Sequence, residues 1–250
     1  METNDKERQL SPAERRRRME ARRERRERER KKKRLRILMI AGAAALLVLI
    51  VVLVFFWMKK SSGKGEHIEP KGDSYVIFLD PGHGGADVGL SGGDGLEKDI
   101  TMDICAKLKI MLESQNYTVI MSREDDTRLS KEERVAAANA SGADLLVSVH
   151  CSYSGDSGVS GAVSHYKEES KASEFLCQNI QEALVKESGA LDGGTDEGRY
   201  NILSDTEMPG VLIEVGYMSN GEEAASLTDD AYQNDMAKGI AKGIILSLSE

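Results

Sequence analysis

The chain has 250 residues, a length that allows one domain of about 150–200 residues together with additional segments. Its formal net charge of −8 combines two parts of opposite sign, because residues 1–36 carry +9 and residues 37–250 carry −17. The three cysteines form no C-x-x-C pair, which argues against a disulfide framework and a cysteine-based zinc site. An aromatic content of 5% argues against a stacking platform for single-stranded nucleic acid.

The N-terminal part of the chain is first basic and then strongly apolar. Residues 13–36 alternate arginine with glutamate, a pattern typical of either a charged helix or a disordered tail. Residues 37–58 contain no charged side chain and as a helix would extend roughly 33 Å, enough to cross a hydrocarbon core of ~30 Å. We therefore predict a tail at 1–36 and a transmembrane signal anchor at 37–58.

The flanking charges predict the orientation of this anchor. The basic run KKKRLR comes directly before the apolar stretch, and only Lys59 and Lys60 follow it directly. The positive-inside rule places the tail in the cytoplasm, where it can contact anionic lipids, and the C-terminal domain outside the cell membrane. A cleaved signal peptide is the alternative, but its apolar region would be only about 7–15 residues long. Nucleic-acid binding is not expected, because a basic run beside a membrane segment more often sets the membrane topology and binds anionic lipids.

A polar linker at 59–72 leads to a domain at 73–250, in which apolar strands alternate with amphipathic helices. Ser130 and Glu133 form a capping box that begins one of these helices. The alternation predicts an α/β fold with a mostly parallel sheet flanked by helices. We expect strands at 75–80, 117–122, 143–149, 211–215 and, near a sheet edge, 159–166, with helices at 99–115, 130–139, 170–187 and 230–248.

Two histidines and two glutamates lie where ligands bind in open α/β sheets, beyond the carboxyl ends of the strands. His83 lies in a glycine-rich loop after the first strand, and this loop returns at Glu97 before a helix. His150 follows the third strand, and Glu214 lies near the end of the late strand. Two imidazoles and a carboxylate form a catalytic zinc set, which predicts Zn²⁺ on His83, Glu97 and His150. Glu214 is then the general base for the attacking water.

Each of these residues also has a structural interpretation. A single histidine after a strand is more often a hydrogen-bonded loop residue, and the helix dipole favours an acid such as Glu97 in the first turn. Glu214 is harder to explain in this way, because a carboxylate inside a buried strand is costly unless it is paired or functional. His165 is either structural or part of the substrate groove. Cys151 is expected to be buried on the face opposite to His150.

Four segments, in this order, resemble the motifs of the zinc-dependent N-acetylmuramoyl-L-alanine amidases of the amidase 3 family. They are LDPGHGG at 79–85, GLEKD at 95–99, SVH at 148–150 and PGVLIEVGYMSN at 209–220. Ser122-Arg123 with Asp126 resembles the T-R-x-x-D element of the family, and Arg134 with Asn139 resembles its R…AN element. The likeness extends over about residues 75–248, nearly all of the predicted domain.

The resemblance implies a six-stranded sheet, zinc on the same three residues and Glu214 as the catalytic acid and base. It also implies hydrolysis of the lactyl-amide bond between N-acetylmuramic acid and L-alanine in peptidoglycan. One membrane anchor with a lone catalytic domain is similar to the spore-cortex amidases of endospore formers. The sequence departs from the family at Ser152, where the pattern S-[IV]-H-x-N-A commonly has asparagine. This departure concerns substrate contacts or rate more than metal binding.

Three other functions are compatible with parts of this pattern. A non-catalytic peptidoglycan-binding or regulatory amidase-like domain would keep the fold without hydrolysis, although all the predicted site residues are present. A zinc peptidase would use the same ligands to cut within the stem peptide. A membrane-tethered interaction protein would act through the arginine-rich tail.

Overall fold

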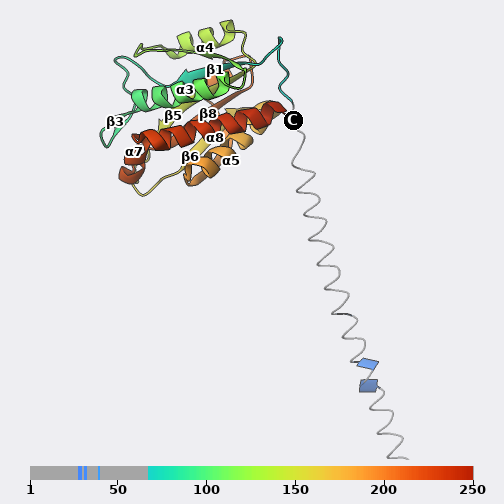
Figure 1. The fold of residues 1–250 in the computed structure, drawn as a ribbon. Helices are drawn as coiled ribbons and strands as arrows, with labels where there is room; N and C mark the ends of the chain where they lie inside the picture. Colours follow the sequence, from blue (N-terminus) through green and yellow to red (C-terminus); the bar gives the residue numbers. More distant parts are fainter. Residues whose placement is uncertain (1–27, 30, 33–38, 40–66, 250) are drawn as a thin grey trace, which may run out of the picture. The chain divides into compact units, whose positions relative to one another are not determined.

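The computed structural model of the chain describes residues 28–29, 31–32, 39 and 67–249. The chain divides into two units, residues 1–63 and 64–250, and the second unit contains the fold (Figure 1). Apart from residue 39, the predicted membrane anchor at 37–58 lies outside the described residues, as does most of the predicted tail. Within the described residues, no helix is both long and apolar enough to span a bilayer.

A six-stranded sheet forms the centre of the second unit, with the strand order β4-β1-β5-β8-β6-β7. Its strands are β1 (Val76–Pro81), β4 (Thr118–Met121), β5 (Leu145–Ser152), β6 (Ala162–Lys167), β7 (Asp192–Gly198) and β8 (Gly210–Tyr217). β4, β1, β5 and β8 run parallel, whereas β6 is antiparallel to β8 and parallel to β7. The predicted α/β fold with a mostly parallel sheet is therefore confirmed.

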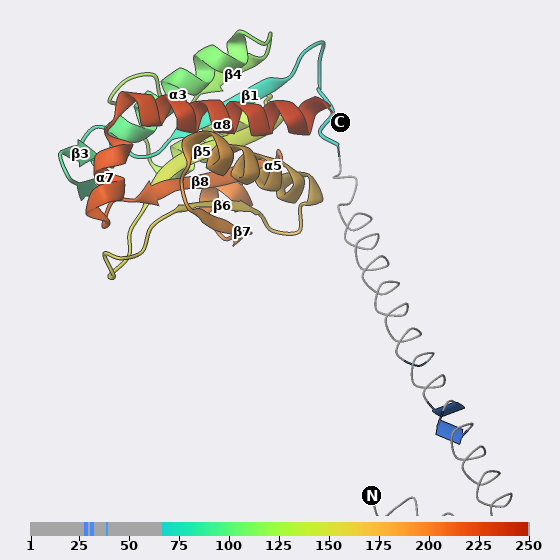
Figure 2. The same ribbon diagram turned by 60° about the horizontal axis from the view of Figure 1, so that its bottom comes forward.

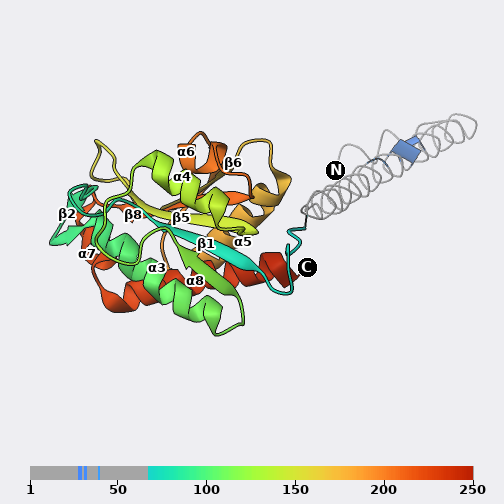
Figure 3. The ribbon, with the colours of Figure 1, turned by 90° about the horizontal axis from the view of Figure 1, so that it is seen from above.

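Helices cover both faces of this sheet (Figure 3). One face carries α3 (Glu97–Glu113), α5 (Lys171–Ser188) and α8 (Asp230–Ser249), which lie in front of the strands in Figure 2. The other face carries α4 (Lys131–Ala140) and α6 (Asn201–Ser204). Ile77 and Leu79 pack into the core on the side of α3, α5 and α8, and Phe78 between them packs into the core on the side of α4 and α6. This alternation is the two-residue period of a strand. The short hairpin β2 (Ser91–Gly92) and β3 (Gly95–Leu96) leads into α3, and α7 (Gly221–Leu227) precedes α8.

The structure differs from the sequence prediction at several places. The strand expected near an edge is β6, which lies one position inward, because β7 pairs with its outer side. β7 has the sequence DGGTDEG and was not predicted, since it contains no apolar residue. β5 continues to Ser152, so that His150 lies within the strand and not after it. In addition, Ile68 of the predicted linker is buried in the core, so the packing of the domain begins before residue 73.

A buried ion pair joins β1 to α4. Ser130 caps α4 in the predicted capping box, and Arg134 follows one turn later, with its Nη1 2.6 Å from Oδ1 of Asp80. The Asp80 carboxylate is 1% exposed and also accepts hydrogen bonds from the hydroxyls of Ser122 and Ser148 at 2.7 and 2.8 Å. Burial alone would raise the pKa of Asp80, but the charge of Arg134 and the hydrogen bond from Ser122 hold it below its ordinary value. The Asp80 carboxylate is therefore charged, and its charge in the core is stabilised by the Arg134 guanidinium.

Replacement of this cation should destabilise the domain. Arg134→Met leaves Asp80 buried without its counter-ion, and we expect a loss of about 3 kcal/mol in the free energy of unfolding. Urea unfolding followed by circular dichroism measures this loss. The exposed Arg128, replaced by alanine, is the matched control and should change the free energy by less than about 0.5 kcal/mol. Equal effects of the two substitutions would show that the buried pair is not a determinant of stability.

Candidate active site

The loop after β1 presents His83 to the interior of the site. His83 has a φ of 58°, an uncommon conformation for a residue with a side chain. Arg134 holds this conformation by donating a hydrogen bond to the His83 carbonyl oxygen. Nδ1 of His83 lies 2.9 Å from Oδ1 of Asp87, so Nε2 is directed at Glu97, 3.2 Å from its Oε2. The loop therefore presents one specific ring nitrogen to the site.

Arg123 fixes the same loop from its other side. Its guanidinium donates to the carbonyl oxygens of residues 81 and 82 at 3.1 and 2.8 Å. Asp126 accepts hydrogen bonds from the backbone N–H of Gly85 at 2.8 Å and from Nζ of Lys98 at 2.7 Å. The T-R-x-x-D-like element thus acts here by holding the backbone around His83, and it provides no side chain to the cluster itself.

Glu97, the first residue of α3, provides a carboxylate that is 1% exposed. Its Oε2 accepts from the backbone N–H of Leu90 at 2.8 Å, and its Oε1 accepts from the N–H of Cys151 at 2.9 Å. The same Oε1 lies 3.1 Å from Nδ1 of His150. Burial alone would raise the pKa of Glu97, but hydrogen bonds with His150 and His83 hold it well below its ordinary value. The site therefore contains a buried, charged carboxylate.

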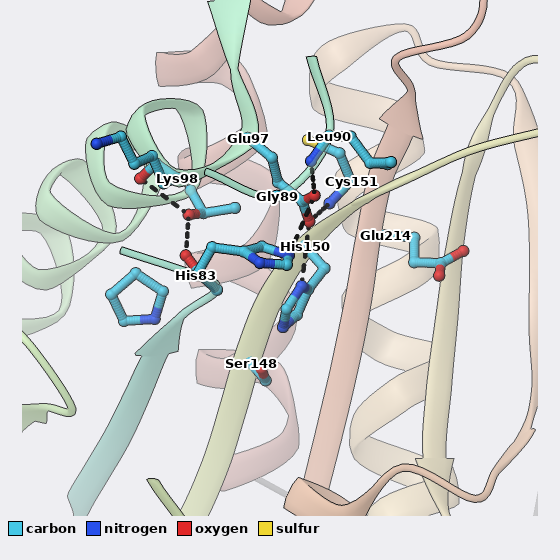
Figure 4. A network of polar contacts seen from close by, with 12 residues as sticks. His83, Gly89, Leu90, Glu97, Lys98, Ser148, His150, Cys151 and Glu214 are labelled. Carbon is cyan, nitrogen blue, oxygen red and sulfur yellow. Dashed lines mark hydrogen bonds and ion pairs between the residues drawn. The ribbon is translucent and has the colours of Figure 1, made fainter. Parts of the chain in front are cut away.

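His83, Glu97 and His150 form one cluster, with potential ligand atoms that all lie within 4.8 Å of one another (Figure 4). The two imidazole rings stand 5.1 Å apart at an interplanar angle of 79°. Hydrogen bonding to Glu97 raises the pKa of His83 above its ordinary value. Two imidazoles and one carboxylate fit the donor set of a divalent transition metal such as zinc. Asp87 behind His83 fits the orienting group that metal-bound histidines usually have.

Glu214 lies on the neighbouring strand β8, in register with His150 of β5. Figure 4 shows it on the far side of His150 from His83. Its Oε2 lies 3.7 Å from Nε2 of His165 on β6. Burial alone would raise the pKa of Glu214, but His165 and a hydrogen bond with Ser152 lower it below its ordinary value. The geometry therefore separates a three-residue cluster from a fourth, ionised carboxylate beside it.

A cavity of about 570 Å³ opens over these four residues. Tyr153, 67% exposed, stands at its side, and Tyr200 and Asn201 line it from the start of α6. The cations among its lining residues are Lys131, Arg134 and Arg199. The volume lies in the range typical of ligand pockets, about 300–1,000 Å³.

The remaining residues of interest have distinct places. Cys151 is buried in the core on the opposite face, as predicted, and it contacts Glu97 through its backbone and not its thiol. His165 is buried beside Glu214. Neither Asp87 nor Tyr200 was predicted from the sequence, because a loop residue and an isolated tyrosine carry no periodic signal. The spacing of Asp87 four residues after His83 was the one available hint.

Comparison with known proteins agrees with this site. Residues 77–246 match the Amidase_3 family, described as N-acetylmuramoyl-L-alanine amidase. The germination-specific N-acetylmuramoyl-L-alanine amidase of Bacillus subtilis (strain 168) is 36% identical over 191 residues, which cover 70% of this chain and 80% of that protein.

Two solved structures are also similar. The N-acetylmuramoyl-L-alanine amidase from Clostridium difficile 630 has a TM-score of 0.69 and 32% identity, covering 72% of this chain and 99% of that one. The CwlD amidase from Clostridioides difficile, solved in complex with the GerS lipoprotein, has a TM-score of 0.68 and 33% identity, covering 70% and 99%. The chain belongs to the N-acetylmuramoyl-L-alanine amidase family, and it is a peptidoglycan amidase, as the sequence motifs indicated.

Gly82 allows the close approach that the cluster requires. A Cβ atom on Gly82 would lie 2.5 Å from Cε1 of His150, so Gly82→Ala must displace this ring or the loop. We expect the affinity for the predicted zinc ion to fall by about 10- to 100-fold, as for other changes around metal ligands. Competition with a chromophoric chelator measures this affinity. Gly72→Ala is the control, because a Cβ there meets no atom within 4 Å. Unchanged affinity in Gly82→Ala would contradict the predicted position of the metal.

Proposed function

We propose that this chain binds zinc through His83, Glu97 and His150 and hydrolyses the amide bond between N-acetylmuramic acid and L-alanine in peptidoglycan. The observation that carries the proposal is the convergence of these three side chains within 4.8 Å, with Glu214 in register on the next strand. Family membership supports the substrate class. The donor set supports the choice of metal.

The residues of the site then have separate roles. Zinc bound there would supply a Lewis acid that polarises the scissile carbonyl and lowers the pKa of the attacking water toward ~7. Glu214 accepts a proton from the water as its oxygen bonds to the carbonyl carbon. The same carboxyl group gives this proton to the L-alanine nitrogen as the carbon–nitrogen bond breaks. The lowered pKa of Glu214 keeps it ionised and ready for the first of these steps.

The cavity offers groups for both parts of the substrate. Tyr153 presents an exposed aromatic ring to which one face of a sugar can bind. Lys131 and Arg199 line the cavity and can pair with carboxylates of the stem peptide. Ser152 stands where the family commonly has asparagine and lowers the pKa of the Glu214 carboxylate, so we assign to it an influence on rate and not on metal binding.

We further propose that residues 37–58 anchor the chain in the cell membrane, with the tail in the cytoplasm and the amidase domain outside. The uncharged 22-residue stretch and the basic run before it support this arrangement. Tethering of this kind would raise the local concentration of the domain at the cell wall. The net negative charge of the domain does not by itself provide attraction to the wall.

The role of Glu214 can be tested with Glu214→Gln in the full-length chain. We expect about one zinc per chain in wild type and variant, and a loss of amidase activity of at least about 100-fold in the variant, because glutamine cannot accept the proton. Zinc content is measured by mass spectrometry, and activity by the release of stem peptides with a new amino-terminal alanine. Glu222→Gln, an exposed change at the start of α7, is the matched control and should retain full activity.

Each contrary result identifies a different alternative. Folded wild type that binds zinc and peptidoglycan without hydrolysis would favour a non-catalytic amidase-like domain. Cleavage between two residues of the stem peptide would indicate a peptidase. Absence of bound zinc would overturn the roles assigned to His83, Glu97 and His150.

Metal removal provides an independent test of the cofactor. A chelator should abolish hydrolysis, and added zinc should restore it, because the residues of the cluster are positioned before the metal binds. His83→Ala should prevent restoration at zinc concentrations that restore wild type. Full activity of wild type after exhaustive chelation would contradict zinc dependence.

A further inference from the structure

His165 has an unusual environment for a residue outside the metal cluster. It lies on β6 and is 9% exposed. Its Nδ1 is held by the carboxylate of Asp196, the residue opposite to it on the edge strand β7. Its Nε2 is the one buried side-chain nitrogen or oxygen without a hydrogen-bond partner within the part of the chain that the structure describes. A buried polar atom of this kind is costly unless it has a function.

This unpartnered nitrogen faces the residue proposed to be the general base. Nε2 of His165 lies 3.7 Å from Oε2 of Glu214, a distance at which charges interact strongly in a partly buried site. Burial alone would lower the pKa of His165, but the Glu214 and Asp196 carboxylates raise it above its ordinary value. An imidazolium at this position therefore lies between the Asp196 carboxylate, which holds it, and the Glu214 carboxylate, whose charge it can stabilise.

The other groups around this pair do not replace the cation. The Tyr200 ring packs beside the imidazole, with centroids 5.1 Å apart, and burial near Glu214 and Asp196 raises the pKa of Tyr200 to about 12, so it stays neutral. On the other side of Glu214, β5 contributes Ser152, which is neutral, and His150. Because His150 belongs to the predicted metal cluster, its nitrogen is engaged there when metal is bound.

We propose that His165 is a positioning residue for amide hydrolysis, with Asp196 holding its imidazolium so that Nε2 keeps the Glu214 carboxylate charged and oriented. This inference rests on the proposed role of Glu214 as the proton acceptor. His165 gives up no proton in the reaction, and the proton that Glu214 takes from water still passes to the leaving amine. The three side chains come from the adjacent strands β7, β6 and β8, so the pairing of the sheet sets their spacing.

The test uses full-length His165→Phe, which keeps an aromatic ring against Tyr200 and removes the charge. We compare its kcat/KM with that of wild type from pH 5 to pH 8, with zinc in excess and bound zinc measured at each pH. Loss of a neighbouring cation raises the pKa of Glu214 by about one unit or more. Glu214 is then protonated at a higher pH than in wild type, so the ratio of variant to wild type should be constant near pH 8 and fall progressively toward pH 5, approaching tenfold only at a pH below both pKa values.

Two further variants keep this test decisive. His165→Gln retains a polar donor without the charge and should show the same pH-dependent fall, even if the phenylalanine variant folds poorly by circular dichroism. Tyr166→Phe, the adjacent residue on the same strand, is the matched control and should give a ratio that does not vary with pH.

The outcomes separate this inference from the proposed function. A ratio independent of pH in both folded His165 variants, with Glu214→Gln inactive, would show that His165 serves packing alone and would overturn the inference. Activity retained in Glu214→Gln would overturn the proposed function itself, and the role of His165 with it.

Discussion

The burial of one carboxylate, that of Glu97, determines how the rest of the site is arranged. A charged group that is 1% exposed is tolerated only when hydrogen bonds and charges surround it. Here the donors are the backbone N–H groups of Leu90 and Cys151 and the rings of His83 and His150. They come from the loop after β1, the segment before α3 and strand β5, so the carboxylate is satisfied only when these elements meet. The same arrangement concentrates metal-ligating atoms at one point.

The site combines two different ways of positioning a side chain. His150 and Glu214 lie on paired parallel strands, so the register of the sheet sets the relative position of the two side chains. His83 lies on a loop, and its position depends on side chains that bind the loop backbone. Arg134 serves both the Asp80 carboxylate and the carbonyl oxygens of this loop, so the buried ion pair that stabilises the fold also orders the site. Such order before ligand binding reduces the cost of assembling a metal centre.

Much of this arrangement could be predicted because its signals are local. The apolar runs of β1, β5 and β8 predict buried parallel strands, and Ser130 with Glu133 predicts the start of α4 correctly. Strand β7 could not be predicted from DGGTDEG, because it exists through pairing with β6 and not through its own propensity. The role of Asp87 behind His83 is also unpredictable from pattern, because it depends on the path of an irregular loop.

The sequence by itself determined the fold class, the family and the identity of the four residues that the proposed chemistry uses. The resemblance of the motifs indicated the family, and strand direction indicated that His83, His150 and Glu214 meet, because parallel strands bring their carboxyl ends to one edge of a sheet. Only the tertiary structure decided that His165, on β6, lies beside Glu214, and that Asp196 holds it there. The physical reason is that the strand order, with β6 between β8 and β7, depends on long-range pairing, which the local pattern of residues does not encode.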